Sequence, residues 1–394
     1  MPNKAGNRMI QINEGIIGPR EPKGKNVKVK TIHDYPGVSQ AHLDIAQVYA
    51  SPKLAGPPIC DELIALMLHT FTEEEASIAR HIGPKARETA ESVAKTANRP
   101  IEEVQPILER LADEKCILLS FGSGENRKYT NLPLAAGSFE MVLMRTSMDT
   151  LTDWHRRFSE LFETLYETGY GTDYWGKLKP SVKYLPIEQT IVSNPMAYPS
   201  DKLEEIFSQY SSFGVTLCQC RIVEELAGRG CGKPKEVCMA LGISADRLIQ
   251  KGKFRRIEMK EALVIKAEAE ANGLVTWITA QDPQTGGSSC SCCGCCCHMM
   301  RIITEFNMPG VIAPPHFMPR VDYEKCNYCG KCALACPMGA ITVDIKNNTH
   351  LHDPARCIGC AQCAVSCSKL KAIEMTAVPG IQDFKQDRKR GALE

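Results

Sequence analysis

The cysteines of this chain are the residues whose type and spacing are best suited to chemistry. The sequence has 394 residues and 20 cysteines, and 18 of the cysteines lie after residue 217. Cytosolic thiols are normally kept reduced, and a chain of this length can bury a core without disulfides. Clustered CxC and CxxC spacings suit a metal, because a short loop can turn two thiolates toward one centre. The pattern therefore predicts metal ligation.

The most specific cysteine pattern lies near the C-terminus. The segments CNYCGKCALACPMGA and CIGCAQCAVSCSKLKA each contain a C-x2-C-x2-C-x3-C run, which is typical of cubane iron–sulfur clusters. In the two-cluster arrangement, the fourth cysteine of each run binds the other cluster. Two complete runs disfavour zinc, so we expect two [4Fe-4S] clusters. The expected ligands are Cys326, Cys329, Cys332 and Cys367 for cluster one, and Cys336, Cys357, Cys360 and Cys363 for cluster two.

The stretch from about residue 318 to 376 resembles bacterial two-cluster ferredoxins. Between the two runs, the sequence AITVDIKNNTHLHD predicts a hairpin that turns at Asn347 and Asn348. Gly330 and Gly359 would let the backbone pass close to the clusters. Ser368 departs from this resemblance, because a proline usually follows the second run, but the ligand set is complete.

Ten further thiols lie upstream, in CQCR, GCGKPKEVC and CSCCGCCC. Neighbours such as Cys292 and Cys293 point to opposite sides of an extended segment, so they cannot easily serve one cluster. With four thiolates per cubane, ten thiols allow two clusters with two thiols left over. We expect one composite region with one or two additional iron–sulfur clusters. Its candidate ligands are Cys218, Cys220, Cys231, Cys238, Cys290, Cys292, Cys293, Cys295, Cys296 and Cys297.

Four other residues have to be interpreted beside these motifs. His298 directly follows the cysteine block, and it is either a ligand or a surface or core histidine. Arg221 either offsets the negative charge of a thiolate cluster or forms an ordinary salt bridge. Cys60 and Cys116 lie in apolar helix and strand contexts, so we expect them to be core thiols.

The order of these motifs resembles a family of multidomain ferredoxin-like proteins from anaerobic bacteria and archaea. In that family, a CxCR motif, a Cys-Pro-Cys segment and a CxCCxCCC block precede a two-cluster ferredoxin module. The segments EANGLVTWI and LPLAAGSFE are also similar, and the resemblance covers most of residues 50–376. Where the family often has histidine after GLV, this chain has Thr276, so no ligand role is expected there. The resemblance implies electron transfer through iron–sulfur clusters.

The rest of the sequence predicts an α+β fold with several domains. Helical patterns from Cys60 onward, followed by a hairpin formed by CILLSF and RKYTNL, indicate a winged-helix-like domain. The expected divisions are an extended arm (1–50), the winged-helix-like domain (51–135), a helical and cysteine-rich iron–sulfur domain (136–315), a dicluster ferredoxin domain (316–378) and a polar tail (379–394).

A winged helix raises the question of DNA binding. The helix in the recognition position, residues 99–115, carries five acidic residues against three basic ones. DNA affinity depends on Lys and Arg neutralising phosphates. The acidic helix therefore disfavours a nucleic-acid partner, and we expect this domain to serve as a scaffold or docking module.

Composition supports an ordinary water-soluble protein. The net charge is +1, hydrophobic residues make up 43% of the chain, and no apolar run approaches the roughly 18 residues of a membrane helix. The N-terminus lacks the apolar stretch of a secretory signal. We expect a cytoplasmic protein that passes single electrons between redox protein partners. The alternatives are an oxidoreductase subunit with a catalytic central cluster and, less favoured, a redox-sensing winged-helix regulator.

Overall fold

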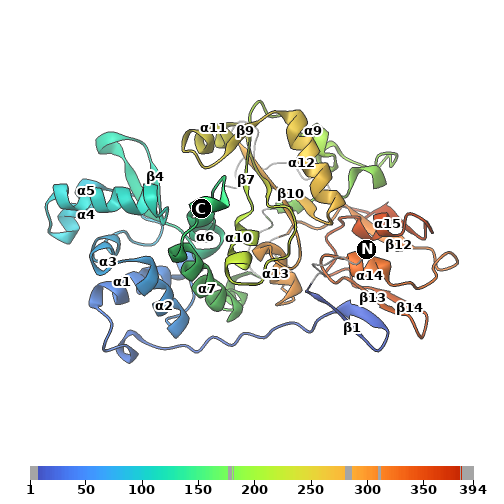
Figure 1. Cartoon of the computed structure of the whole chain (residues 1–394), viewed down its shortest axis with the longest axis horizontal. Coiled ribbons are helices and arrows are strands. Elements are labelled where there is room, and N and C mark those ends of the chain that lie inside the picture. The colour runs from blue at the N-terminus through green and yellow to red at the C-terminus, as the bar shows by residue number, and fades with distance from the viewer. Residues whose placement is uncertain are drawn as a thin grey trace.

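Three regions follow one another along the long axis of the molecule (Figure 1). The computed structural model describes residues 8–175, 180, 182–279, 286–308, 312–381 and 383. A helical N-terminal region comes first, a central region built on a six-stranded sheet follows, and the third region contains the two C-terminal cysteine runs. This mixture of helices and sheets agrees with the expected α+β class.

The N-terminal region consists of short helices and a three-stranded sheet in the order β3-β5-β4. Thr72 and Glu75 form the capping box of α3, as the sequence predicts. The helices and the hairpin follow the predicted order, and the winged-helix class itself stays a prediction. The elements are α1 (Gln40–Tyr49), α2 (Asp61–Thr70), α3 (Glu73–Ala79), β3 (Glu88–Thr89), α4 (Ala90–Ala97), α5 (Ile101–Glu109), β4 (Leu118–Phe121) and β5 (Lys128–Asn131).

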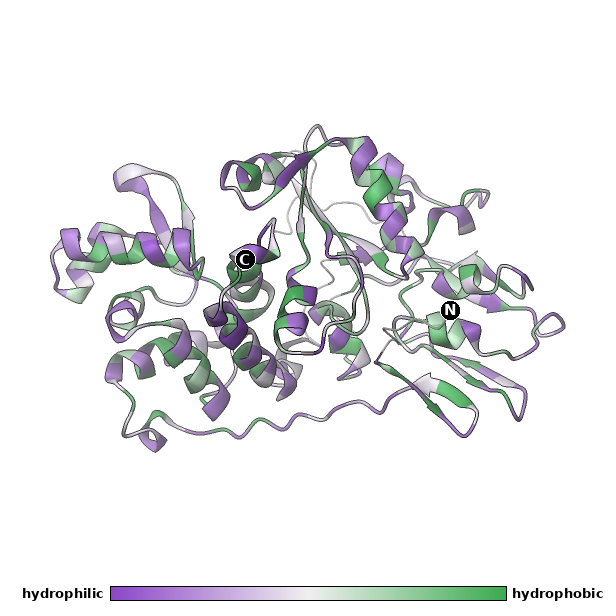
Figure 2. Ribbon diagram, viewed as in Figure 1, coloured by the Kyte–Doolittle hydropathy of each residue, from purple (hydrophilic) through white to green (hydrophobic). Residues whose placement is uncertain are grey.

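The apolar core of this region extends beyond the domain boundary expected at residue 135. It continues through α6 (Phe139–Leu143) and α7 (Asp153–Glu167) to α10 (Gln219–Leu226). The helices carry hydrophobic residues on the sides that face one another and hydrophilic residues elsewhere (Figure 2). Cys60 and Cys116 are both buried, which confirms that they are core thiols. The N-terminal helices are thus packed directly onto α10, an element that carries part of the cysteine-rich region.

The central region is an antiparallel sheet in the order β6-β10-β11-β8-β7-β9. Cys218 directly follows β7, Cys238 lies on β8, and Cys290 and Cys292 lie on β11. Pairing of β11 with β8, and of β8 with β7, brings these cysteines together. The elements here are α8 (Thr172–Trp175), β6 (Val182–Tyr184), α9 (Leu203–Phe207), β7 (Phe213–Leu217), β8 (Glu236–Leu241), α11 (Ile243–Gln250), β9 (Arg255–Ile257), α12 (Met259–Ala271), β10 (Val275–Thr279), β11 (Gly287–Cys292) and α13 (His298–Thr304).

The C-terminal region has two short helices and two strand pairs. The predicted hairpin is present as β13 and β14, and Asn348 has a φ of 52° at its turn. The first and last strands, β12 and β15, pair antiparallel and close the region. Its elements are β12 (Phe317–Val321), α14 (Lys331–Ala335), β13 (Ile341–Asp344), β14 (Thr349–His352), α15 (Gln362–Ser366) and β15 (Ile373–Ala377).

The N-terminal arm differs from the extended arm expected over residues 1–50. Its described part begins with a hairpin of β1 (Ile10–Asn13) and β2 (Ile16–Pro19), and β2 pairs with β13 to form a four-stranded sheet. The chain then runs along the length of the molecule to α1 (Figure 1). Sequence reasoning missed this hairpin because each strand has only four residues and its partner lies more than 300 residues away.

Ile17 anchors the arm to the C-terminal region. Its side chain is 3% exposed, and it packs so closely over Gly330 that a Cβ at Gly330 would lie 2.4 Å from Ile17 Cδ1. Gly330 also has a φ of +74°, so both its conformation and its small size are required.

Substitution of Ile17 by alanine should therefore destabilise the protein. We expect a loss of about 2 kcal/mol in the free energy of unfolding, because the change leaves a cavity between two strands. Denaturant unfolding of the full chain measures this loss. The matched control is Ile12→Ala on the neighbouring strand, where the side chain is 66% exposed and we expect almost no change. Equal stability of the two variants would contradict this role for the arm.

Candidate metal centres

The eight cysteines of the two C-terminal runs line two neighbouring cavities. One cavity has a volume of about 270 Å³ and is lined by the four cysteines predicted for cluster one, and the other, smaller cavity is lined by the four predicted for cluster two. The fourth cysteine of each run thus lies beside the other run. The first set is Cys326, Cys329, Cys332 and Cys367, and the second is Cys336, Cys357, Cys360 and Cys363. The arrangement suits the predicted ligand assignment, which stays a prediction.

Burial and a backbone hydrogen bond influence the protonation of the thiols around these cavities. Burial raises the pKa of Cys332 and of Cys357 to about 12, so both thiols retain their protons unless a metal binds them. The Ala340 amide donates a hydrogen bond to Cys336 Sγ at 3.3 Å. Such bonds stabilise a thiolate and influence the reduction potential of a cluster.

The two cavities differ in their access to solvent. Cys329, at the first cavity, is exposed. At the second cavity, Cys336 and Cys360 are buried in an apolar cluster that also contains Cys292 and Cys297 of the central region. The first cavity therefore faces the surface, and the second lies against the central cysteines.

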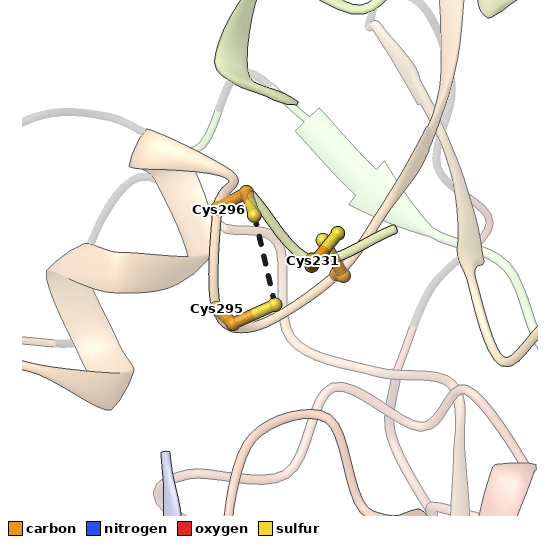
Figure 3. Close-up of side chains that lie close together, drawn as sticks. Cys231, Cys295 and Cys296 are labelled. Carbon is orange, nitrogen blue, oxygen red and sulfur yellow. Dashed lines mark hydrogen bonds between the residues drawn. The ribbon is translucent and has the colours of Figure 1, made fainter. Parts of the chain in front are cut away.

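Four of the ten central thiols form a compact group, which we call the four-thiol set: Cys231, Cys293, Cys295 and Cys296. Their sulfur atoms all lie within 4.8 Å of one another, and Cys295 Sγ and Cys296 Sγ are 3.6 Å apart (Figure 3). Cys231 comes from the loop after α10, whereas the other three come from the loop between β11 and α13. All four side chains are buried. This donor set can hold a thiophilic metal ion.

The other six central thiols form a closed ring, which we call the six-thiol ring. Each sulfur interacts with two neighbours. The thiols come from the junction between β7 and α10, from α10, β8 and β11, and from the loop that precedes α13. The order around the ring is Cys218, Cys220, Cys297, Cys292, Cys290, Cys238 and back to Cys218.

Thiolate character is favoured at alternate positions of the six-thiol ring. Hydrogen bonds from Cys220 and Cys238 lower the pKa of Cys218, and the hydrogen bond from Cys238 lowers the pKa of Cys290 to about 5. The same bonds raise the pKa values of the donors Cys220 and Cys238. Part of the ring is therefore poised to bind metal at neutral pH, since the thiolate is the ligand form.

Two buried cations lie against the central thiols. Arg221 is 2% exposed, donates hydrogen bonds to the Ser291 carbonyl at 3.1 Å and lies 3.9 Å from Cys293 Sγ. Lys266 is 1% exposed and donates to Ser291 Oγ at 3.2 Å. Burial lowers the Lys266 pKa to about 8 even though nearby cysteines act to raise it. These two cations are placed to offset the negative charge of thiolates, so the first interpretation of Arg221 is the one that the geometry favours.

His298 belongs to a different network. Its Nε2 atom lies 2.5 Å from Glu163 Oε1, and its ring packs against Phe139, Phe162 and Tyr166. It therefore behaves as a core histidine beside the thiols. Arg301, which is fully buried, joins the same network through Glu163 and Glu224.

The structure changes one sequence-based expectation for the central cysteines. Ten thiols allow two groups of four with two left over, in one composite region, whereas they lie in groups of four and six. Neighbouring cysteines were expected to point to opposite sides of an extended segment. This is correct for Cys292 and Cys293, which fall into different groups. Cys295 and Cys296 instead belong to the same group, because the chain forms a turn there and is not extended.

Sequence reasoning also missed two aromatic residues at the ring. Trp277 Nε1 donates a hydrogen bond to Cys292 Sγ at 2.9 Å, and Tyr184 lies buried beside Cys292 and Cys297. The pairing of β10 with both β6 and β11 places them there. The position of Trp277 in the strand just before the cysteine block could have indicated that it lies near these thiols.

Comparison with known proteins identifies one region of the chain. Residues 319–342 match a family model described as a 4Fe-4S binding domain. This segment contains the first C-terminal cysteine run and supports a [4Fe-4S] cofactor. No curated protein and no solved structure was found to match the chain. Among the helices that the structure describes, none has both the length and the apolar character needed to cross a membrane.

Proposed function

We propose that this protein transfers single electrons between redox partner proteins through [4Fe-4S] clusters. The observation that carries the proposal is the pair of cavities lined by the eight cysteines of the two C-terminal runs, together with the family match over the first run. Thiolates at this spacing bind cubane clusters, whose chemistry is one-electron transfer.

The position of the two cavities suggests a direction for electron flow. The exposed Cys329 marks cluster one as the point of contact with an external redox protein. Cluster two lies beside the central thiols, so it is placed to pass electrons inward to the central region. Cluster one, cluster two and the central centre would then act in series.

Three cysteine variants of the full chain test this proposal and its ligand sets. Cys336→Ser and Cys363→Ser come from different runs but line the same cavity, so both should remove the same paramagnetic signal and about four irons. Cys367→Ser should remove the other signal. Iron analysis and EPR on anaerobically purified, reduced protein measure these changes, and the matched control is Cys60→Ser, a buried thiol in the N-terminal core.

The test depends on which variants remove the same EPR signal. The ligand assignment would be wrong if Cys336→Ser and Cys367→Ser removed the same signal, because both lie in the fourth position of a run. Electron transfer itself would be refuted if the unmodified chain held zinc and no reducible chromophore.

A further inference from the structure

The four-thiol set carries an inference that goes beyond electron transfer. We propose that its members, Cys231, Cys293, Cys295 and Cys296, bind one tetrahedral ion of zinc or iron without sulfide. This ion fastens the Cys231 loop to the cysteine block, so the site has a structural role. The inference uses the positions of the four sulfur atoms and does not depend on the proposed function.

The sulfur–sulfur distances fit a single ion. A tetrahedral ion with metal–sulfur bonds of about 2.3 Å holds its ligands about 3.8 Å apart, and zinc and iron both accept four sulfur ligands. Cys295 Sγ and Cys296 Sγ lie 3.6 Å apart, and all four sulfur atoms lie within 4.8 Å of one another. A cubane binds each thiolate through a different iron, so its ligands are spaced more widely. The set would have to open before it could hold a cubane.

The cysteines predicted for cluster one offer a comparison within the same chain. Across the residues that the structure describes, the four-thiol set is the one group of cysteine, histidine or acidic side chains that lies at the spacing of a single ion. The four cysteines predicted for cluster one do not form such a group, because they surround a cavity of about 270 Å³. The chain thus contains a wide and a close arrangement of four cysteines, and the close one matches a single ion.

The backbone of the cysteine block brings three of the four ligands together. The chain turns after Cys293, whose carbonyl accepts a hydrogen bond from the Cys296 amide at 3.4 Å. The Thr304 hydroxyl donates to the Gly294 carbonyl at 3.1 Å, which holds the turn against α13. Because of this turn, the adjacent residues Cys295 and Cys296 direct their sulfur atoms to the same centre.

The surroundings of the four-thiol set suit a closed site. All four side chains are buried, and they share an apolar cluster with Met9 of the N-terminal arm and with Leu274. A structural metal site has four protein ligands and no open position for water or substrate, as in this set. Four thiolates around a divalent ion leave two negative charges in excess, and Arg221, 3.9 Å from Cys293 Sγ, is placed to offset one of them.

An ion at this position would connect segments that are far apart in the sequence. Cys231 lies in the loop between α10 and β8, and the other three ligands lie more than 60 residues later, between β11 and α13. The loop, residues 227–235, contains no helix or strand of its own. A bond from Cys231 to the ion would therefore fix the loop in place.

Zinc, iron and acid-labile sulfide analysis of the anaerobically purified full chain tests the inference. We expect Cys231→Ser and Cys295→Ser each to remove one metal ion per chain and no sulfide, although the two residues lie in different loops. Cys116→Ser, a buried thiol outside the site, is the matched control and should lose no metal. An unchanged far-UV circular dichroism spectrum shows that each variant is folded.

Two further measurements test the single ion and its structural role. In the unmodified chain, X-ray absorption at the zinc edge should give four sulfur neighbours at about 2.3 Å, or Mössbauer spectroscopy should give one iron per chain that belongs to no cluster. In Cys295→Ser, the amides of residues 227–235 should lose protection from hydrogen exchange, although Cys295 lies outside that loop.

Three results would overturn the inference. Loss of about four irons and matching sulfide from Cys295→Ser would show a cubane in the four-thiol set. Loss of no metal from either variant would show that the set binds none, and unchanged hydrogen exchange of the loop would refute the structural role. Failure of the proposed function would look different, because it concerns the ferredoxin irons that Cys336→Ser and Cys367→Ser report and that the variants of the four-thiol set should retain.

Discussion

Replacement of Arg301 by methionine is expected to lower the free energy of unfolding by about 3–5 kcal/mol at pH 7. Arg301 is fully buried and forms ion pairs with Glu163, Glu224 and Glu305 at 2.5–3.1 Å. Methionine fills a similar volume but leaves these buried carboxylates without their cation. Uncompensated buried charge is among the most destabilising changes in a protein core.

The loss of stability caused by Arg301→Met should become smaller as the pH falls. Burial acts to raise the Glu163 pKa, but the charges of His298 and Arg301 lower it overall. A lowered pKa means that Glu163 contributes stability above its unfolded pKa, and that this contribution is lost as the pH falls. Without Arg301 the pKa rises, so the folded variant can protonate Glu163 as the pH falls. The difference between the variant and the unmodified protein should therefore shrink from pH 7 toward pH 5.

The Arg301 network also connects to the six-thiol ring. Glu224 lies on α10, which carries Cys220, and Arg301 lies on α13, which directly follows Cys297. We therefore expect Arg301→Met to reduce the iron content of the protein as well. Urea unfolding at several pH values and iron analysis measure both effects. Arg157→Met, which removes an exposed pair with Glu160, is the control, and an equal loss in the two variants would contradict the prediction.

Gly294→Ala is expected to have the second largest effect. A Cβ at Gly294 would lie 1.7 Å from the carbonyl oxygen of Pro337, which directly follows Cys336. A backbone atom cannot move aside as a flexible side chain does, so the loop itself must shift. Overpacking of this kind costs about 1–3 kcal/mol, and we expect a value at the upper end of that range.

The shift should also disturb metal binding, since Gly294 lies between Cys293 and Cys295 of the four-thiol set. We expect a lower metal content and slower electron transfer through the protein. Metal analysis and the kinetics of reduction measure these effects. Gly37→Ala, at a glycine with no atom within 4 Å of the added carbon, should change neither, and wild-type behaviour of Gly294→Ala would refute the predicted contact.

Local signals in the sequence predicted much of this architecture. The capping box at Thr72 and the hairpin at Asn348 depend on residues only a few positions apart, and both are present. The two ferredoxin ligand sets could be predicted because the spacing of each run is itself a constraint on geometry. The paired cavities contain those same sets.

Contacts between residues far apart in the sequence could not be predicted. The arm hairpin joins β13 through only two residue pairs, Ile17 with Val343 and Ile16 with Asp344, so no local pattern could reveal it. The division of the central thiols depends on the order of strands in the six-stranded sheet. Cys231 joins the four-thiol set from more than 60 residues away, and spacing alone does not indicate such a partner.

Reductive titration of the anaerobically purified full chain, followed by EPR, tests the central claim most directly. Electron transfer through iron–sulfur clusters predicts a brown protein in which two [4Fe-4S] centres accept one electron each and interact magnetically. Plant-type ferredoxins, near −400 mV, indicate the rough scale of their potentials. A colourless protein that contains zinc and accepts no electrons would contradict the account.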